Sequence, residues 1–273
     1  MAFYNWRSYF NDFEPKRVDG EEKEKINSKQ EKILVRQIFK RSSHNLYMKK
    51  GSSKIKAILL DVGDVLVLSK KPLKKYKNKT YHLGVHENIA KKLNISLDQY
   101  FDSIDTTYAK SIEGKISKEK VIEILSRNFK ISKQKLKTIY FEVYKHQFKQ
   151  NIQLLKQLFR LKKLGYKIAI LSDQWCLSKE ALIPKKFYKI FDEILVSCDI
   201  GIRKPNLKIY QLAIKKLKFA SHEILFIDNQ KWNIFPAKKL GMKTILFKNN
   251  KQLFRDGGWR AISRDIIAKP NFK

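Results

Sequence analysis

Five short apolar runs mark the chain, and the first of them is the clearest. Residues 57 to 60 are apolar without interruption, and they lead directly into Asp61. A strand that is buried on both faces of a parallel sheet has this continuous apolar pattern. We therefore predict strands over about 56–60, 167–171, 193–196, 223–227 and 243–247.

Helical spacing of apolar residues alternates with the later strands. Helices are expected over 152–164, 207–217 and 233–240, and Gly165 and Gly241 are typical residues at which two of them would stop. Strands that alternate with helices indicate a parallel sheet with right-handed crossovers.

A long helical block separates the first strand from the second. After a basic loop over 69–80, helical spacing continues from about His86 to Lys149 with no strand signal. We expect three helix N-caps in this block: Ser96, which forms a capping box with Gln99, and Ser117 and Ser132. The fold class is therefore α/β, a Rossmann-like parallel sheet core with an inserted all-helical domain.

These patterns divide the chain into four parts. Residues 1–54 form an aromatic and basic N-terminal extension, with an expected charged helix over 21–41, and we favour a poorly ordered tail over a binding arm. The α/β core takes residues 55–70 and 150–250, the helical insertion takes 71–149, and a C-terminal segment takes 251–273.

The composition is that of a globular protein, with 43% hydrophobic and 12% aromatic residues. No apolar run approaches the roughly 18–20 residues that span a bilayer, and the first residues lack the apolar region of a secretory signal. Cys176 and Cys198 are too few for a disulfide scaffold. We expect a cytoplasmic protein with no membrane partner.

The net charge of +33 has two interpretations. One is nucleic-acid binding. The other is compositional bias, since lysine greatly outnumbers arginine and the lysines are spread along nearly every predicted helix. Arginine, which suits bidentate contacts with phosphate and guanine, is not enriched. We favour bias, and nucleic-acid binding stays the alternative.

Polar residues follow the predicted strands where chemistry is expected. Asp61, Ser172 and Asp228 stand at strand ends, and Lys204 comes just after a fourth strand. Parallel strands share their carboxyl edge, where open α/β sheets place their sites, so these four residues can converge. Asp61 by itself is equally well explained as a residue of a turn.

Two carboxylates, a cation and a hydroxyl suit phosphoryl transfer. Asp61 and Asp228 can hold Mg²⁺, which prefers oxygen ligands. Asp61 can attack phosphorus as a nucleophile, while Lys204 neutralises the developing charge and Ser172 donates to a phosphoryl oxygen.

The residues around these four positions resemble the haloacid dehalogenase superfamily, in its subgroup with a helical cap inserted after the first motif. Four motifs occur in family order within about residues 55–250. They are Asp61–Leu66, Ile168–Asp173, Gly201–Asn206 with Ile209 and Tyr210, and Phe226–Asn229 with Asn233, Ala237 and Leu240–Met242.

The resemblance implies a hydrolase that forms an aspartyl-phosphate on Asp61. It implies Mg²⁺ ligands from Asp61, the backbone carbonyl of Gly63 and Asp228, and substrate contacts from Ser172, Asp173 and Lys204. The helical insertion would be the cap that selects the substrate. The expected substrate is a small phosphorylated metabolite, which makes the expected enzyme a phosphoric monoester phosphatase.

Two positions depart from the family pattern. Gly63 stands where relatives usually have a second aspartate as general acid and base, and a one-residue shift makes Asp64 an uncertain substitute. An Asp-x-Gly branch of the family does include phosphatases. Asn229 replaces a second acidic residue that is common there. These departures motivate an alternative, a weak or inactive binding protein on this fold that associates with nucleic acid.

Other residues near the site have ordinary interpretations. Dehalogenase activity is less favoured, since no clear arginine lies early in the insertion to receive a halide. Trp175 and Trp232 can line the mouth of the pocket, but aromatic residues more often pack in the core than bind a ligand. His82 and His86 are more typical of a surface or packing role.

Overall fold

The structure is a computed structural model that describes residues 54–70, 74–76, 79–81 and 83–268. The interpretation of residues 1–54 as an extension falls almost wholly outside the described residues, and so does His82.

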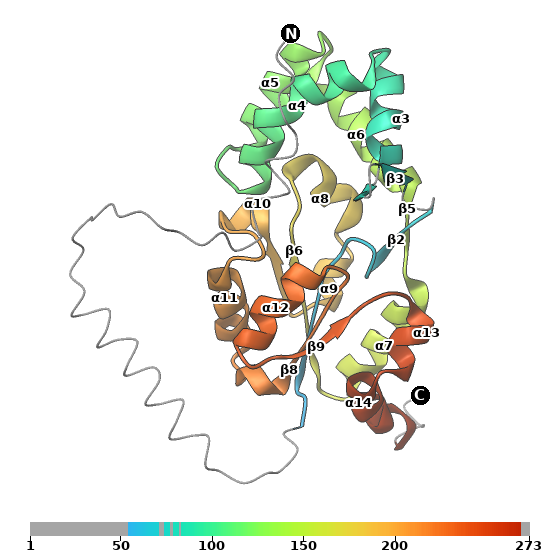
Figure 1. The fold of residues 1–273 in the computed structure, drawn as a ribbon, viewed down its shortest axis with the longest axis vertical. Coiled ribbons are helices and arrows are strands. Elements are labelled where there is room, and N and C mark those ends of the chain that lie inside the picture. Colours follow the sequence, from blue (N-terminus) through green and yellow to red (C-terminus); the bar gives the residue numbers. More distant parts are fainter. Residues whose placement is uncertain (1–53, 71–73, 77–78, 82, 269–273) are drawn as a thin grey trace, which may run out of the picture. The chain divides into compact units, whose positions relative to one another are not determined.

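A five-stranded parallel sheet confirms the α/β class (Figure 1). The strand order is β7-β6-β1-β8-β9, so the first strand of the chain lies in the middle, paired with β6 and β8. The strands are β1 Ala57–Leu60, β6 Lys167–Ser172, β7 Glu193–Val196, β8 Ile224–Asp228 and β9 Lys243–Leu246. All five correspond to the predicted runs.

Helices cover both faces of this sheet. Alternate side chains of β1 point to opposite faces, and all four are apolar and buried, so each face needs a covering layer. Ala57 and Leu59 pack in one apolar cluster with α11 Leu207–Leu217 and α12 Lys231–Lys239. Ile58 and Leu60 belong to a second, larger cluster that extends into the insertion and includes residues of three further helices of the core. These are α7 Ile152–Lys163, α13 Asn250–Arg255 and α14 Gly257–Ala268. The last two helices lie in the C-terminal segment, for which no structure was predicted.

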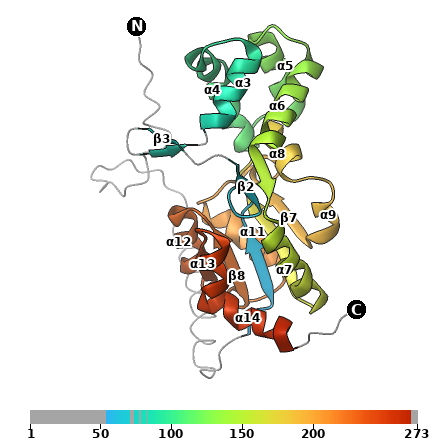
Figure 2. The same cartoon turned by 90° about the vertical axis from the view of Figure 1, so that its right-hand side faces the viewer.

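The described part of the insertion contains four helices between β2 Val67–Ser69 and β5 Phe148–Gln150. They are α3 Leu83–Leu93, α4 Leu97–Ile112, α5 Lys118–Asn128 and α6 Lys133–Gln147. The capping box of Ser96 with Gln99 is confirmed, and the hydroxyls of Ser117 and Ser132 each accept a hydrogen bond from the backbone N–H three residues later. Figures 1 and 2 both show these helices gathered together.

Short strands at both ends of the insertion correct the prediction. β2 Val67–Ser69 pairs antiparallel with β5 Phe148–Gln150, where a loop and the end of a helix were expected. β3 Lys74–Tyr76 pairs with β4 Lys79–Tyr81 inside the predicted basic loop. Strands of three residues are too short for a periodic pattern, and the partner of β2 lies about 80 residues away in the chain, so no local signal marks them.

Several short helices complete the fold. They are α8 Cys176–Leu182, α9 Phe187–Ile190, α10 Ser197–Ile200 and the 3₁₀ helix η1 Ser221–Glu223. α8 follows the end of β6 and lies beside α6 of the insertion (Figure 1). Within the described residues, no helix combines the length and the apolar character needed to cross a bilayer.

Candidate functional site

Three of the four predicted site residues meet in a buried ion-pair network. Asp61 directly follows β1, Asp228 ends β8, and Lys204 comes from the loop after α10. The Nζ atom of Lys204 lies 3.0 Å from Oδ1 of Asp61 and 2.6 Å from Oδ2 of Asp228. All three side chains are buried.

Lys204 is held as a cation by its neighbours. Its side chain is almost completely enclosed, and burial alone lowers the pKa of an ammonium group. Attraction to Asp228, Asp61 and Asp173 outweighs burial, so the pKa of Lys204 lies above its usual value. The site therefore keeps a fixed positive charge next to Asp61.

Asp228 is surrounded by hydrogen-bond donors. Its carboxylate accepts from Nζ of Lys204, from the backbone N–H of Gln230 at 2.7 Å, and from Nδ2 of Asn233 at 3.2 and 3.0 Å. A carboxylate has about four acceptor positions, and these contacts occupy four. Burial raises the pKa of Asp228 to about 6, against the opposing effect of Lys204. Asp228 thus orients Lys204.

Asp61 differs from Asp228 because one of its oxygens is available. Its backbone N–H donates to Ile227 on the neighbouring strand at 3.0 Å, which fixes its position. Oδ1 faces Lys204, whereas no described residue hydrogen-bonds Oδ2. Asp61 also lines a cavity of about 270 Å³ at this edge of the sheet. One oxygen is therefore held and the other can react.

In the turn after Asp61, Gly63 and Asp64 have different roles. Gly63 lines the cavity, and a Cβ atom built there would meet no heavy atom within 4 Å. Asp64 adopts a left-handed φ of 53°, which aspartate tolerates better than most residues, and its Oδ1 accepts the backbone N–H of Ser69 at 2.9 Å. Asp64 does not line the cavity. Its carboxylate instead stabilises the turn that leads into β2.

Asp173 lies in the cavity wall and holds the Lys204 loop. Its Oδ1 accepts the backbone N–H of Lys204 at 3.0 Å, and its Oδ2 lies 3.5 Å from Nε of Arg203. Burial raises the pKa of Asp173, although Lys204 and Arg203 act in the opposite direction. Arg203 was not predicted as a site residue.

Ser172 lies beside the ion-pair network and contacts none of its charged groups. It is fully buried at the end of β6, and its hydroxyl accepts a hydrogen bond from Nε2 of Gln174 at 3.2 Å. The other side of that amide, Oε1, accepts from the hydroxyl of Ser178 at 2.7 Å. Gln174 and Ser178, not Ser172, line the cavity.

The insertion supplies one side of the cavity, which we call the insertion wall. It consists of Val85, His86, Tyr108, Ile112, Tyr144 and Phe148. The charged residues of the cavity, Asp61, Asp173, Arg203 and Lys204, all come from loops at the sheet edge. The cavity therefore has a charged side and an opposite side without formal charge, apart from the titratable His86.

Trp175 joins the two sides, and Trp232 lies at the mouth. The indole N–H of Trp175 donates to the hydroxyl of Tyr144 at 3.0 Å, and its ring lies 5.0 Å from that of Tyr108 and 5.3 Å from that of Tyr140. Trp175 is buried, whereas Trp232 is 60% exposed, although both line the cavity. Cys176 is a packing residue, since it is buried within the larger apolar cluster.

Sequence reasoning missed the roles of several cavity residues. Asn233 belongs to the fourth motif, but the motif does not predict its hydrogen bond to Asp228. That contact depends on how the turn after β8 folds. Tyr108 and Tyr144 lie on different helices and converge only through packing. No signal in the sequence marks that convergence.

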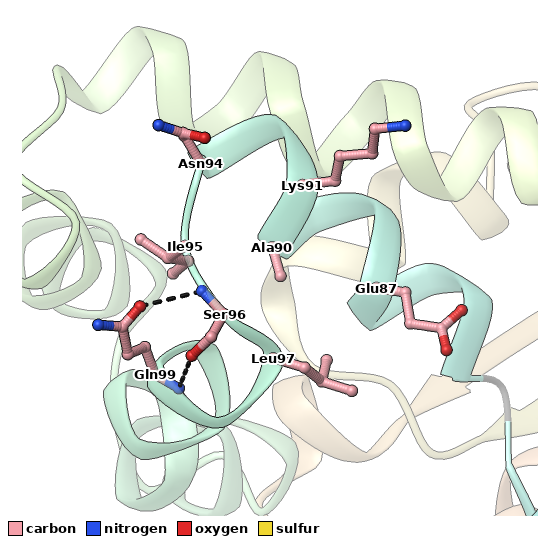
Figure 3. A pocket seen from close by; sticks show the side chains of 8 residues that line it. All are labelled: Glu87, Ala90, Lys91, Asn94, Ile95, Ser96, Leu97 and Gln99. Carbon is pink, nitrogen blue, oxygen red and sulfur yellow. Dashed lines mark hydrogen bonds between the residues drawn. The ribbon is translucent and has the colours of Figure 1, made fainter.

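A second hollow, of about 440 Å³, lies on the insertion where α3 ends and α4 begins (Figure 3). Ser96 and Gln99 line it, and their polar atoms already hydrogen-bond each other's backbone. It contains none of the residues of the four motifs, so it is not a candidate active site.

Curated relatives include phosphatases and other hydrolases. The chain is similar to glyceraldehyde 3-phosphate phosphatase of Pyrococcus abyssi, with 32% identity over 35% of this chain and 41% of the relative. It is also similar to bifunctional epoxide hydrolase 2 of Sus scrofa, with 30% identity over 40% of this chain and 20% of the relative. (S)-2-haloacid dehalogenase 4A of Burkholderia cepacia is 34% identical over 32% of this chain and 38% of the relative. The chain thus spans less than half the length of each of these relatives.

The fold is also that of solved structures. A HAD family enzyme of Bacteroides thetaiotaomicron, crystallised with magnesium and inorganic phosphate, matches with a TM-score of 0.58 and 18% identity over 74% of this chain and 100% of the other. A predicted HAD-like family hydrolase of Porphyromonas gingivalis matches with a TM-score of 0.56 and 21% identity over 77% of this chain and 97% of the other.

A family model extends these local matches across the core and the insertion together. The model for haloacid dehalogenase-like hydrolases matches residues 58–247, from β1 to just after β9, and so includes all four motifs. With its sheet order and its Asp61, Lys204 and Asp228 network, the chain belongs to the haloacid dehalogenase-like hydrolase family.

Proposed function

We propose that this hydrolase is a phosphoric monoester phosphatase that acts on a small phosphorylated metabolite, with Asp61 as its nucleophile. The available oxygen of Asp61, in a cavity beside the buried Lys204 cation, is the observation that carries the proposal. The similarity to glyceraldehyde 3-phosphate phosphatase supports the reaction class.

The reaction has two balanced steps. In the first, Oδ2 of Asp61 attacks phosphorus, the ester P–O bond breaks, and the leaving alkoxide takes a proton from water. In the second, water attacks the phosphorus of the aspartyl-phosphate, and the acyl-phosphate bond breaks to release inorganic phosphate and restore the carboxylate. A covalent intermediate divides a difficult hydrolysis into two easier steps.

Lys204 stabilises the negative charge that develops on the phosphoryl oxygens, since it is already charged and held in place. Asp173 positions the Lys204 loop and reaches the substrate side of the cavity. Ser172 is the predicted donor to a phosphoryl oxygen, but it does not line the cavity, so this contact requires the Gln174 side chain that hydrogen-bonds it to move aside.

Mg²⁺ is the proposed cofactor, and the cavity offers part of the ligand set that the ion needs. The described residues contain no group of three acidic, histidine or cysteine side chains of the kind that holds a metal by itself. Mg²⁺ is commonly held by one or two carboxylates together with substrate phosphate, so Asp61 and the Gly63 carbonyl suit it.

The third predicted ligand, Asp228, would have to give up one of its four contacts with three donor groups to bind the ion. We therefore propose the side-chain oxygen of Asn229, which lines the cavity, as the third protein ligand. When bound, Mg²⁺ would offset the repulsion between Asp61 and the phosphate.

The insertion acts as the cap in this proposal, with residues 71–149 as its predicted extent. Val85, Ile112 and Phe148 close the cavity opposite Asp61 and limit the access of water. Because Gly63 supplies no proton, the leaving group depends on solvent for protonation. We expect slow turnover of esters whose alcohols are poor leaving groups.

The test is phosphate release from p-nitrophenyl phosphate with Mg²⁺ and with EDTA. We expect Asp61→Asn to lose at least about 10³-fold in kcat, since the nucleophile is removed. Asp64→Asn is the matched control and should keep near-normal activity, because asparagine tolerates the left-handed turn and can still accept from Ser69. Equal activity of Asp61→Asn and the unaltered protein would refute the assignment of Asp61 as the nucleophile. Equal activity of the unaltered protein in EDTA and in Mg²⁺ would refute the requirement for the metal.

The alternative function is nucleic-acid association by a catalytically weak protein, favoured by the net charge of +33. Binding of RNA or DNA should then fall steeply as salt rises, because each neutralised phosphate releases counterions. A complex that is absent, or that does not respond to salt, would exclude this function.

A further inference from the structure

The two sides of the active-site cavity differ in chemistry. All four formal charges of the cavity lie on loops at the sheet edge, where the phosphate would bind. The insertion wall lies opposite and consists of Val85, Ile112 and Phe148, two tyrosines and one histidine. That wall faces the part of the substrate that is not phosphate.

Several polar atoms around this part of the cavity are already used within the protein, although no described residue hydrogen-bonds the hydroxyl of Tyr108. The Tyr144 hydroxyl accepts from Trp175, and Nδ1 of His86 lies 3.2 Å from the hydroxyl of Tyr100. Gln174 and Ser178 hydrogen-bond each other. A ligand with several hydroxyl groups would therefore lose its hydrogen bonds to water and find few partners in the cavity. Each hydroxyl left without a partner lowers the binding free energy by about 1–3 kcal/mol.

The cavity is small as well as apolar on this side. Its volume of about 270 Å³ lies just below the range of about 300–1,000 Å³ that is usual for pockets of drug-sized ligands. The ring of Tyr108 packs on the buried Trp175 with their centroids 5.0 Å apart, so the orientation of the Tyr108 ring that lines the cavity is fixed. Rings of this kind suit a flat or unsaturated partner.

We propose that the preferred substrate is a small phosphomonoester whose alcohol part is apolar and aromatic, not a polyol such as a sugar. The inference rests on the proposed phosphatase function and concerns the same cavity. The phosphate meets the charged residues of the sheet edge, and the ring of the alcohol packs on the insertion wall.

The experiment compares benzyl phosphate with glycerol 3-phosphate under the same conditions. Both release a primary alcohol, so the ester chemistry is closely matched and the apolar ring is the main difference. Burial of one ring predicts a value of kcat/KM about 10- to 100-fold higher for benzyl phosphate. An equal or higher value for glycerol 3-phosphate would overturn the inference.

Val85→Thr tests the insertion wall itself. Val85 is buried in α3 and lines the cavity, and threonine keeps its shape but replaces one methyl group with a hydroxyl. We expect the preference for benzyl phosphate to fall by about threefold or more. Val121→Thr is the matched control, since Val121 is buried in α5 but does not line the cavity. Equal effects of the two substitutions would contradict the role of the wall.

Binding separates this inference from the proposed function. In Asp61→Asn protein, thermal stabilisation by benzyl phosphate and by glycerol 3-phosphate can be compared without turnover. If the unaltered protein hydrolyses neither ester but benzyl phosphate alone stabilises the variant, the phosphatase proposal fails, while the preference of the cavity for an aromatic phosphomonoester as ligand stands. If both esters stabilise it equally, or neither does, the inference fails.

Discussion

Gly63 is the residue at which this site differs most from what its family leads one to expect. Its neighbour Asp64 does not replace the missing carboxylate, because the Asp64 side chain holds the N–H of Ser69. The space for a side chain at Gly63 nevertheless exists, since a Cβ atom there would have no neighbour within 4 Å. The backbone at Gly63 also has no positive φ that would strain a larger residue.

Gly63→Asp should therefore fold normally and raise the turnover of alkyl phosphates. A carboxyl group at this place can donate a proton to the leaving alcohol, an effect worth about 10²- to 10⁴-fold where proton transfer limits the rate. The measurement is kcat for benzyl phosphate. Gly63→Asn has the same size but no proton to transfer, so a gain that appears equally in both variants would point to packing and not to acid catalysis.

Asp192 gives a pH dependence of stability. Its carboxylate accepts the N–H of Ile168 at 2.9 Å and lies within 3.4 Å of Lys162 and 3.3 Å of Lys167. Burial would raise the pKa of Asp192, but these contacts outweigh it and lower the pKa below its usual value of 3.8. The ionised group thus stabilises the fold above about pH 4, and this contribution disappears as the pH falls through the lowered pKa.

Asp192→Asn should accordingly lower the free energy of unfolding by about 1 kcal/mol at pH 7. The deficit should shrink as the pH falls below 4, because Asp192 is protonated first in the unfolded state and then, at its lowered pKa, in the folded state. Urea unfolding of both proteins at pH 7 and pH 3 measures it. A deficit that is the same at both pH values would show that charge is not its origin.

At the scale of elements, one close contact ties the insertion to the loop that carries Lys204. Gly114 follows α4 with a φ of +65°, and a Cβ atom there would lie 2.8 Å from the Cα of Gly201. Gly201 opens the segment that leads to Lys204 and Pro205. The hydroxyl of Ser111 also accepts from the backbone N–H of Cys176 at 3.2 Å, so the end of α4 touches the core at two points.

Gly114→Ala should lower stability by about 1–3 kcal/mol and should also reduce activity, because the Gly201 backbone would have to shift. Gly165→Ala is the matched control. Gly165 has a φ of +90° but nothing within 4 Å of a built Cβ, so it incurs the conformational cost alone. Unfolding in urea and phosphate release report the two effects. Identical losses in both variants would remove the close contact as the cause.

The elements also show how far the sequence could predict this structure. The strand Glu193–Val196 and the helix Leu207–Leu217 agree with prediction to the residue, because apolar spacing within one element fixes them. β2 and β5 could not be predicted, because each is stabilised mainly by pairing with the other. At the site, the positions of Asp61, Ser172 and Asp228 at strand ends could be predicted from the sequence. The donors around Asp228 and the approach of tyrosines from separate helices could not, because they depend on contacts between distant parts of the folded chain.

At the scale of the whole molecule, the charge of +33 makes self-repulsion a general cost of folding. Salt screens charges over about 10 Å at 0.1 M, so it should relieve this repulsion. We expect Tm to rise between 20 mM and 300 mM NaCl, by about 2–4 °C for each kcal/mol relieved. A Tm that falls in calorimetry over this range would mean that ion pairs such as Lys179 with Asp199 dominate.

The pairing of β2 with β5 has a practical consequence for protein engineering. Val67 lies opposite Gln150 and Ser69 opposite Phe148, so the chain leaves the core and returns to it on adjacent strands, roughly 5 Å apart. The segment between these strands can therefore be exchanged for that of another protein by two splices at neighbouring positions. Such a chimaera would transfer the insertion wall except Phe148, which lies in β5, while leaving Asp61, Lys204 and Asp228 in their own sheet.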